Sequence, residues 1–468
     1  MVNFQPVAIP ARSAQGKMPS MNQPIRNPNS ALPSDDPQRE VLHNEVHARP
    51  AARIRLPALV VFIAVLNDGV SREAECQHLN RLPGQGKLTP ADLQENFLRL
   101  RFTDHTLRWE RHSEFTRYSL VQALPPHASL DATNPELLSS LSLDAAWLRA
   151  IPGRTVAAIK LVMLAESLAD PEVLLDRARH WFGDHAVVAS MMGHGHSVVV
   201  TDFRLRDSGF ERMLVLAPTD TSETRAGRIS SRLLELETYR LMALRGLPVA
   251  KALGPILAES EAVLSTITAR LEGKHDSDQD LLDILVALAA RVERATAEHM
   301  YRFAATQAYD ALVLQRIAEL REKPIPGTQT VGEFMQRRLS PAIATVAATA
   351  QRLASLSQRI ERAGGLLRTR VDIVTEAQNQ QLLAKLTRGQ ELQLRLQRTV
   401  EGLSIAAISY YVISLVFYAG KAANAAGLPI NPEIAAGAMI PVVLWGVAWL
   451  TRRIHRRFKA GASGASPS

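Results

Sequence analysis

Two long stretches near the C-terminal end of the sequence carry no charged residue, and they constrain the fold more than any other feature. One covers residues 402–420 and the other covers residues 434–451. A helix rises about 1.5 Å per residue, so each stretch reaches roughly 27–29 Å, close to the ~30 Å thickness of the hydrocarbon core of a bilayer. The sequence therefore predicts two C-terminal transmembrane helices that form a hairpin over residues 402–451.

Basic residues flank this hairpin and predict its orientation, because Lys and Arg in short loops stay on the cytoplasmic side during insertion. The connecting loop carries one base, Lys421, and one acid, Glu433. We therefore expect both termini to be cytoplasmic, with a basic cytoplasmic tail over residues 452–468. The flanking basic residues are Lys385, Arg388, Arg395, Arg398, Arg452, Arg453, Arg456, Arg457 and Lys459.

The composition leaves room for soluble units beside the hairpin. The chain has 468 residues, of which 46% are hydrophobic and 21% are charged, which is typical of a globular protein with a small membrane part. The net charge is +8, but no nucleic-acid recognition motif accompanies it. Because the basic tail suits anionic lipid, we expect a lipid bilayer as a partner and no nucleic acid.

The N-terminal residues and the cysteine count narrow the class further. Residues 1–40 are rich in Pro, Ser and Asn and lack a long apolar core, so they predict a disordered tail and not a signal peptide. Cys76 is the only cysteine in the sequence. A disulfide framework and a cysteine zinc site are therefore excluded, and a reducing cytoplasm fits.

Residues 41–220 alternate apolar runs with short helices, which fit 72–82 and 171–182. Each half of this region has a strand, a helix and then three strands. The pattern predicts a cytoplasmic α/β domain with a mixed sheet and an internal duplication. The predicted strands are 58–66, 97–102, 107–112, 118–124, 155–164, 186–191, 197–203 and 213–217.

Residues 221–401 change to long helices, so the chain as a whole is predicted to be α+β. Apolar residues recur every three or four positions from 229 to 243, and further helices fit 249–271 and 278–322. Ser340 followed by Pro341 is a helix start, since proline is favoured at the first helical position. A helix over 341–420 would be a stalk that continues into the first span.

A heptad stripe lies in the first part of this stalk. It predicts a coiled-coil-like seam that packs against neighbouring helices or against other subunits. We therefore expect a homo-oligomer. The stripe consists of Leu339, Val346, Leu353, Ile360, Leu367 and Val374.

A first polar cluster invites a functional interpretation. An extended backbone would point His43, Glu45 and His47 to one side. His and Glu there could hold a divalent metal. Two other interpretations stay open: a ligand or anion site that uses His47 and Arg49, and a structural hydrogen-bonded turn.

A second polar cluster lies in the predicted strand at 107–112. Alternation puts Arg108, Glu110 and His112 on one face and Trp109 on the other. A cross-strand ion-pair ladder is the simpler interpretation. The alternative is a ligand pocket shared with the first cluster, and its candidate residues are Glu45, His47, Arg49, Trp109, Glu110 and His112. The glycine–histidine pairs of residues 193–196 predict a flexible turn between strands.

Several motifs of known chemistry are missing from the sequence. It has no Gly-rich phosphate loop ending in Lys-Ser or Lys-Thr, no His-Glu-x-x-His, no Gly-x-Ser-x-Gly and no dinucleotide glycine pattern after a strand. Neither span contains Asp, Glu, Lys, Arg or His, which are the usual marks of a proton relay or transport site. The sequence thus assigns no catalytic residue, cofactor or metal, and it favours a protein that is not an enzyme.

Five segments resemble an uncharacterised family of bacterial membrane-anchored proteins, called domain of unknown function 3422. The resemblance covers about residues 40–451 and implies a bacterial membrane-anchored protein. Together with the two predicted spans, it leads us to expect a multi-pass protein of the bacterial inner (cell) membrane. It carries over no catalytic residue. The segments are 43–50 (HNEVHARP), 107–115 (LRWERHSEF), 237–240 (ETYR), 367–371 (LRTRV) and 394–404 (LRLQRTVEGLS).

The layout supports two functional hypotheses. The first is a membrane-tethered scaffold or sensor whose soluble part faces the cytoplasm. The second is an ion channel or transporter gated by the cytoplasmic domain, because the order of α/β domain, stalk and two C-terminal spans is similar to that of CorA-type magnesium transporters. Those proteins carry Gly-Met-Asn at the outer end of the first span, where this sequence has Tyr418, Ala419 and Gly420. A shared layout does not establish a shared function.

Overall fold

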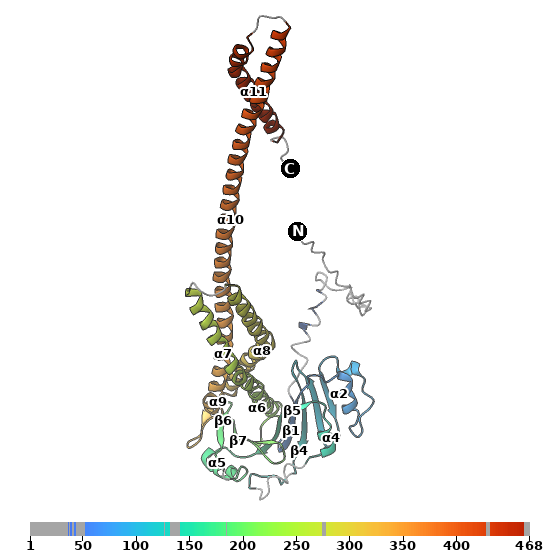
Figure 1. Ribbon diagram of the computed structural model, residues 1–468. Helices are drawn as coiled ribbons and strands as arrows, with labels where there is room; N and C mark the ends of the chain where they lie inside the picture. Colours follow the sequence, from blue (N-terminus) through green and yellow to red (C-terminus); the bar gives the residue numbers. More distant parts are fainter. Residues whose placement is uncertain are drawn as a thin grey trace, which may run out of the picture. The chain divides into compact units, whose positions relative to one another are not determined.

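The computed structural model divides into two compact units (Figure 1). The first contains Met1–Thr266 and Ala287–Arg359, and the second contains Ile267–Val286 and Ile360–Ser468. The residues that the structure describes are 36, 38–39, 42–43, 52–125, 127–131, 141–183, 185–273, 278–426 and 431–462.

The first unit is built on one mixed sheet of nine strands, in the order β2-β3-β4-β1-β5-β8-β7-β6-β9. The predicted mixed sheet and the α+β class are therefore confirmed. Eight strands correspond to predicted ones, and β9 adds a short edge beside β6. The strands are β1 (Ala58–Leu66), β2 (Phe97–Arg101), β3 (His105–Arg111), β4 (Phe115–Ala123), β5 (Arg154–Ala165), β6 (Val188–Met192), β7 (Ser197–Leu205), β8 (Glu211–Ala217) and β9 (Lys323–Pro324).

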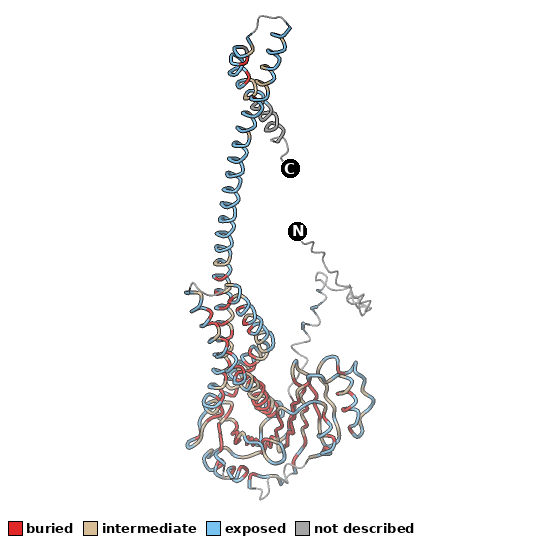
Figure 2. Tube along the Cα trace, in the orientation of Figure 1, coloured by how far each residue is buried: buried red, intermediate tan, exposed pale blue. Residues whose placement is uncertain are grey.

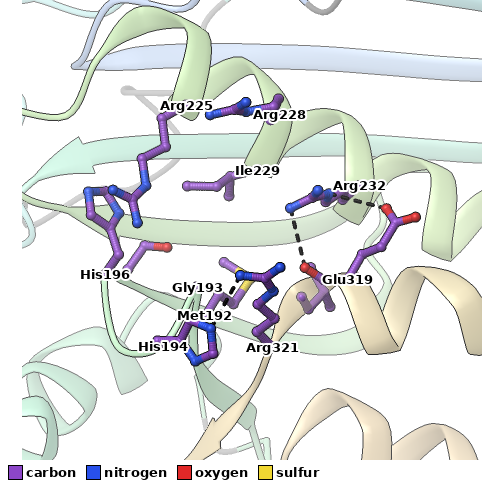
Figure 3. Close-up of a pocket in the computed structure, with 12 residues that line it drawn as sticks. Met192, Gly193, His194, His196, Arg225, Arg228, Ile229, Arg232, Glu319 and Arg321 are labelled. Atoms are coloured by element: carbon purple, nitrogen blue, oxygen red, sulfur yellow. Dashed lines mark hydrogen bonds and ion pairs between the residues drawn. The ribbon is translucent and has the colours of Figure 1, made fainter.

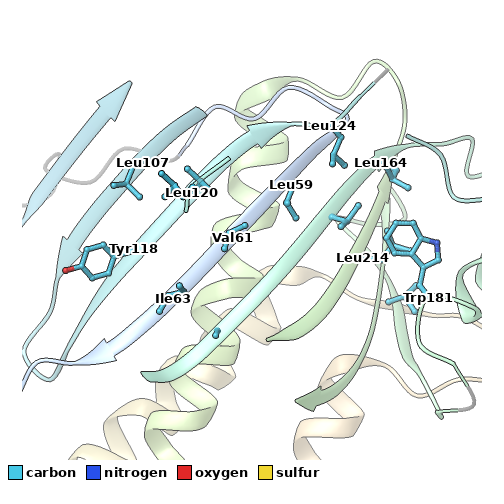
Figure 4. Close-up of a cluster of buried hydrophobic side chains, with 14 of the residues drawn as sticks. Leu59, Val61, Ile63, Leu107, Tyr118, Leu120, Leu124, Leu164, Trp181 and Leu214 are labelled. Atoms are coloured by element: carbon cyan, nitrogen blue, oxygen red, sulfur yellow. The ribbon is translucent and has the colours of Figure 1, made fainter. Parts of the chain in front are cut away.

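The central strand β1 is apolar along its whole length because both of its faces are covered. Leu59, Val61 and Ile63 point into one hydrophobic core (Figure 4). Val60 and Phe62 point into the core on the opposite face. A strand that is buried on both sides needs a continuous apolar run in place of an alternating one.

The two halves of the sheet have the same order of neighbours but different strand directions. In the first half β1 lies beside β4, followed by β3 and β2. In the second half β5 lies beside β8, followed by β7 and β6. However, β1 pairs with β4 in antiparallel fashion, whereas β5 pairs with β8 in parallel. Two halves that differ in this way do not superpose as whole units.

Short helices cover one face of the sheet and long helices cover the other. The first core contains Leu79 of α2, Trp147 of α4 and Leu175 of α5. The second core contains Leu233 of α6 and Val313 of α8. The short elements are α2 (Arg72–Leu79), η1 (Pro90–Leu93), α4 (Ala145–Arg149) and α5 (Pro171–Arg179).

Capping side chains define where several of the long helices begin. Ser222 caps α6 by accepting a hydrogen bond from the backbone N–H of Arg225, and Thr330 forms a capping box with Glu333 at the start of α9. One helix, α10, follows Leu339 and contains the whole of the predicted stalk. The helices are α6 (Glu223–Leu244), α7 (Gly246–Glu272), α8 (Asp278–Leu320), α9 (Val331–Arg338), α10 (Ser340–Ala425) and α11 (Pro432–Ala462).

The heptad stripe along α10 is largely covered within a single chain. Val346 and Leu353 are buried in the first unit, and Leu367 is buried in the second. Val374 is 43% exposed, so the covered part of the stripe ends before it. Any contact between subunits through this stripe therefore lies beyond Leu367, and the oligomer stays a prediction.

Among the residues that the structure describes, three helical segments are long and apolar enough to cross a membrane. Two of them, Val331–Ala425 and Pro432–Leu450, contain the predicted spans, and the third is Glu223–Glu272 in α6 and α7. Figure 2 shows α10 as a largely exposed helix; residues 372–400 are exposed throughout, whereas residues 402–420 are mostly a mixture of exposed and half-buried residues. The structure therefore supports association with a membrane by length and composition.

Candidate functional site

Half of the predicted pocket falls outside the residues that the structure describes. Glu45, His47 and Arg49 belong to this undescribed part, and His43 beside them is exposed. Where the chain is described again, Ala52 lies against α6, and its carbonyl oxygen occupies the space that a side chain at Gly227 would need. Among the described residues, no three His, Cys, Asp or Glu side chains gather as a metal site.

The other half of the predicted pocket is split between the two faces of β3. Trp109 is buried in the first core, while Glu110 is 2% exposed and points to the opposite face. Glu110 lies directly across from Arg117 of β4 and pairs with it, and Arg108 Nη2 lies 2.5 Å from Glu110 Oε1. The predicted cross-strand ion pair is therefore present.

The charge of Glu110 is held by its two arginine neighbours. Burial alone would raise the pKa of this carboxyl group, but Arg117 and Arg108 together keep the pKa below its ordinary value. Glu110 is thus an anion in a buried, compensated network. Breaking such a pair by removing one partner leaves an uncompensated buried charge, so the network has a structural role.

The network continues from the sheet through two helices. Arg117 Nη1 lies 3.2 Å from Glu235 of α6, and Glu235 accepts a hydrogen bond of 2.7 Å from Arg316 of α8. Arg316 also pairs at 2.9 Å with Glu319, which in turn pairs at 3.3 Å with Arg232 of α6. An unbroken series of ion pairs therefore joins β4 to the far end of α8.

Of the predicted pocket residues, His112 lines a cavity. Its Nε2 lies 4.0 Å from Glu110 Oε2, and its ring stacks on Phe115 with centroids 4.5 Å apart. The cavity has a volume of about 560 Å³ and an open, mostly polar wall. It is lined by Arg72, Asn96, Arg111, His112, Ser113, Phe115, Tyr239, Tyr309 and Leu312.

A second cavity, called the arginine cavity below, lies at the other end of the ion-pair series. Its volume is about 270 Å³. Figure 3 shows its side chains arranged around the space between α6, the β6–β7 turn and the end of α8. The lining contains four arginines and one glutamate, so the wall carries a formal charge of +3 when both histidines are counted as neutral. The lining residues are Met192, Gly193, His194, His196, Ser197, Arg225, Arg228, Ile229, Arg232, Glu319, Leu320 and Arg321.

Helical spacing places the arginines of α6 in this wall. Arg225, Arg228 and Arg232 are separated by three and four positions, so they lie along one face of the helix. Arg232 is held by Glu319. Within the described part of the chain, no carboxylate pairs with the guanidinium group of Arg225 or Arg228.

The β6–β7 turn forms the opposite wall and is fixed by its backbone. Gly193, His194 and Gly195 all have positive φ values of 60°, 63° and 101°. The N–H of Gly193 donates to the Leu320 carbonyl at 2.8 Å, and the N–H of His194 donates to the Arg321 carbonyl at 3.3 Å. The turn is thus tied to the C-terminal end of α8, where backbone carbonyls lack partners within the helix.

Two polar groups in this wall lack hydrogen-bond partners among the described residues. Ser197 is fully buried, and its hydroxyl faces no acceptor or donor. His196 Nδ1 is likewise buried and unpaired. Burial, and then the positive charge of Arg225, lower the pKa of His196, so its imidazole is neutral at pH 7.

Only part of this site could be recognised from the sequence. The segment 193–196 is a turn between strands, as predicted, but it is also a wall of the cavity. The spacing of Arg225, Arg228 and Arg232 along one helix face was the signal that could have drawn attention to it. Arg321 directly follows α8 and lies more than 80 residues after Arg232 in the sequence. Only the fold brings these two side chains to the same cavity.

A buried pair of acids with a base lies between β8 and α6. Glu211 and Glu237 are both buried, and Arg240 pairs with Glu237 and lies 3.8 Å from Glu211. Burial, followed by the neighbouring charge of Glu237, raises the pKa of Glu211 to about 9. Glu211 is therefore neutral at pH 7, which leaves one ion pair between Glu237 and Arg240.

In the second unit, Arg370 fastens the end of α7 and the start of α8 to α10. Its guanidinium group donates to the carbonyl of Leu271 at 2.8 Å and to that of Gly273 at 3.2 Å. It also pairs with Asp278 at 3.1 Å. A cation suits these positions because helix C-termini present unpaired carbonyl groups. This motif residue therefore has a structural role.

The sequence profile of one protein family matches residues 34–458 of the chain, and the family is described as "Protein of unknown function (DUF3422)". Since the match covers most of the sequence, the chain belongs to this family, and the predicted resemblance is confirmed. Searches of curated proteins and of solved structures found no match.

Proposed function

We propose that this member of the DUF3422 family is a membrane-anchored sensor or scaffold whose mixed-sheet unit faces the cytoplasm. The observation that carries the proposal is the exposed apolar surface of α10 and α11. Tyr411, Leu415 and Trp445 are each at least two-thirds exposed. Soluble monomers rarely expose large contiguous apolar patches, and lipid covers such side chains when the segments span a bilayer.

Aromatic and basic side chains near the end of the second apolar stretch support the anchor. The rings of Trp445 and Trp449 stack with centroids 6.4 Å apart. The guanidinium carbon of Arg453 lies 5.0 Å from the centroid of Trp449. Tryptophan is enriched at the membrane interface, and arginine just beyond a span favours the cytoplasmic side. This pairing therefore supports a cytoplasmic C-terminus.

The continuity of α10 supports a sensing role. This helix contains residues of both compact units and has no break between Ser340 and Ala425. A helix is stiff because each turn is hydrogen-bonded to the next. A ligand that shifts the N-terminal part of α10 would thus transmit the shift along one backbone.

An ion channel is the second candidate, and one buried polar group in the apolar helix favours it. Ser409 is 2% exposed, and its hydroxyl has no partner among the described residues. Serine hydroxyls of this kind can line a polar path. Two spans cannot enclose a pore alone, so this candidate requires an oligomeric ring.

Cysteine labelling tests the anchor and its orientation. In a Cys76→Ala background, Asn424→Cys places a thiol after the first span and Ser208→Cys places one in the sheet unit, where both native residues are exposed. A membrane-impermeant maleimide should label Asn424→Cys in spheroplasts and Ser208→Cys only after lysis. Labelling of Ser208→Cys in intact spheroplasts would contradict a cytoplasmic sheet unit.

The mass of the purified full-length protein separates the two candidate functions. Light scattering that distinguishes protein from detergent gives the number of subunits. A monomer or dimer is expected for a tethered sensor or scaffold and rules out a pore of two-span subunits. A ring of four or more subunits would favour the channel and justify measurements of cation flux in liposomes.

A further inference from the structure

We infer that the arginine cavity binds a small anion that carries phosphate groups. The inference names the class of ligand for the sensor proposed above. It rests on that proposal only for what ligand binding does in the cell. The residues that carry it are Arg225, Arg228, Arg321, His196 and Ser197, which all line the cavity.

The charge of the wall calls for an anion. Arg225 and Arg228 project from one face of α6 without a carboxylate partner among the described residues. Arg321 Nη1 lies 3.3 Å from His194 Nε2. Several arginines in one small space repel each other, and a polyanion removes this repulsion. The guanidinium fork matches phosphate oxygens in two-point contacts.

The cavity also holds neutral donors at its inner wall. The hydroxyl of Ser197 is buried without a partner among the described residues, and His196 Nδ1 is in the same state. A buried polar group without a hydrogen-bond partner destabilises the unliganded protein. A phosphate oxygen can accept hydrogen bonds from both groups, so ligand binding would satisfy them.

The wall is arranged before any ligand arrives. The backbone hydrogen bonds from the β6–β7 turn to Leu320 and Arg321 fix the turn against α8. The ion pair between Arg232 and Glu319 fixes α6 against the same helix. A site held in this way loses little conformational entropy on binding.

The volume of the cavity limits the size of the ligand. At about 270 Å³ it is slightly smaller than the usual range for sites of drug-sized ligands, roughly 300–1,000 Å³. A diphosphate or a small phosphorylated metabolite fits this space. A nucleic-acid strand does not, which agrees with the absence of a recognition motif.

Calorimetry with inorganic pyrophosphate tests the inference on the full-length protein in nanodiscs of neutral lipid. We expect one site per chain. In the double variant Arg225→Gln/Arg228→Gln we expect affinity to fall by at least roughly tenfold, since a hydrogen bond to a charged group contributes about 1.5–3 kcal/mol. The matched control is Arg337→Gln/Arg338→Gln, which removes two exposed arginines of α9 and should leave affinity unchanged.

The inner wall provides an independent variant. Ser197→Ala removes one neutral donor and keeps all the charges, so we expect a loss of roughly three- to tenfold. Circular dichroism verifies that each variant melts at the temperature of the native protein. Absence of pyrophosphate binding to the native protein would overturn the inference, and so would equal losses in the α6 and α9 double variants.

A further titration identifies the source of the phosphate. Competition between dihexanoyl phosphatidic acid and pyrophosphate would indicate that the ligand is a lipid headgroup. A lack of competition would indicate a soluble anion. Either result agrees with a ligand that carries phosphate. The labelling of Asn424→Cys does not depend on the cavity. If labelling succeeds and pyrophosphate does not bind, the anchor stands and the ligand class is wrong.

Discussion

The segment Glu223–Glu272, which contains α6 and α7, and residues 402–420 of α10 are both apolar enough to cross a membrane, but their apolar side chains are covered to different extents. In the segment Glu223–Glu272, which contains α7, 33% of the most apolar window is buried inside the structure. In the segment Val331–Ala425 the corresponding share is 6%. The protein itself thus covers part of the apolar surface of the first segment, whereas it leaves nearly all of the apolar window in α10 uncovered.

The positions of the apolar side chains around each helix explain the difference in burial. In α7 the buried side chains of Leu253, Leu257 and Leu264 follow one face, which is the pattern of a helix packed on a core. In residues 402–420 of α10 no position around the helix carries a charge, and Leu403 and Leu415 are exposed. A helix that is apolar all round is stable in a core or in a lipid layer, so composition alone does not distinguish the two cases.

Truncation after Glu401 is the strongest test of this comparison. The shortened chain keeps α6 and α7 and loses both C-terminal apolar stretches. We expect the full-length protein to stay in the membrane pellet after carbonate extraction and the truncated chain to move to the supernatant. A truncated chain that resists extraction would show that the segment Glu223–Glu272 also inserts.

One pair of identical substitutions compares the two helices within the full-length protein. Leu257 is 1% exposed and Leu415 is 69% exposed. Leu257→Ala should lower the free energy of unfolding by about 2–5 kcal/mol because it leaves a cavity. Leu415→Ala should change it by less than about 0.5 kcal/mol. Urea denaturation followed by circular dichroism measures both, and equal effects would contradict the comparison.

The elements of the fold were predictable where local sequence determines them. The strand β1 has the predicted bounds because its apolar run ends at Pro57 on one side and Asn67 on the other. The edge strand β9 was missed because Pro324 resembles a turn residue. Proline is tolerated there, since an edge strand can leave one side without ladder hydrogen bonds.

The candidate sites were less predictable because they join distant parts of the chain. Arg117 meets Glu235 across a separation of 118 residues, and no periodicity encodes that contact. The pairing of Glu110 with Arg117 was predictable in kind, because alternation along a strand places charges on one face. The meeting of α6 with the β6–β7 turn depends on the packing of the whole unit.

The buried acids Glu211 of β8 and Glu237 of α6 give a third test of whether α6 belongs to a protein core. Because burial and Glu237 raise the pKa of Glu211 to about 9, the folded state keeps a proton that the unfolded state loses above its ordinary pKa. This contribution to stability is complete below about pH 4.5 and is lost as the pH rises toward 9. Glu211→Gln should therefore raise Tm at pH 8 by roughly 2–4 °C and leave it unchanged near pH 4.5.

The control for this pH effect is Glu298→Gln, which alters an exposed carboxylate of α8. It should change Tm by little at either pH. A Glu211→Gln variant that melts below the native protein at pH 8 would show that Glu211 is ionised and needed by Arg240, and the buried acid pair would have to be reinterpreted.

The smallest expected effect concerns the ion pair that ties α7 to α10 at the surface of the first unit. Arg352 donates two hydrogen bonds to Glu261, and both side chains are partly exposed. A double-mutant cycle with Arg352→Gln and Glu261→Gln should give a coupling of about 0.2–1 kcal/mol, because solvent screens an exposed pair. A larger coupling, measured by urea denaturation, would mean that this surface is shielded by another subunit, since an apolar partner strengthens the attraction between the charges.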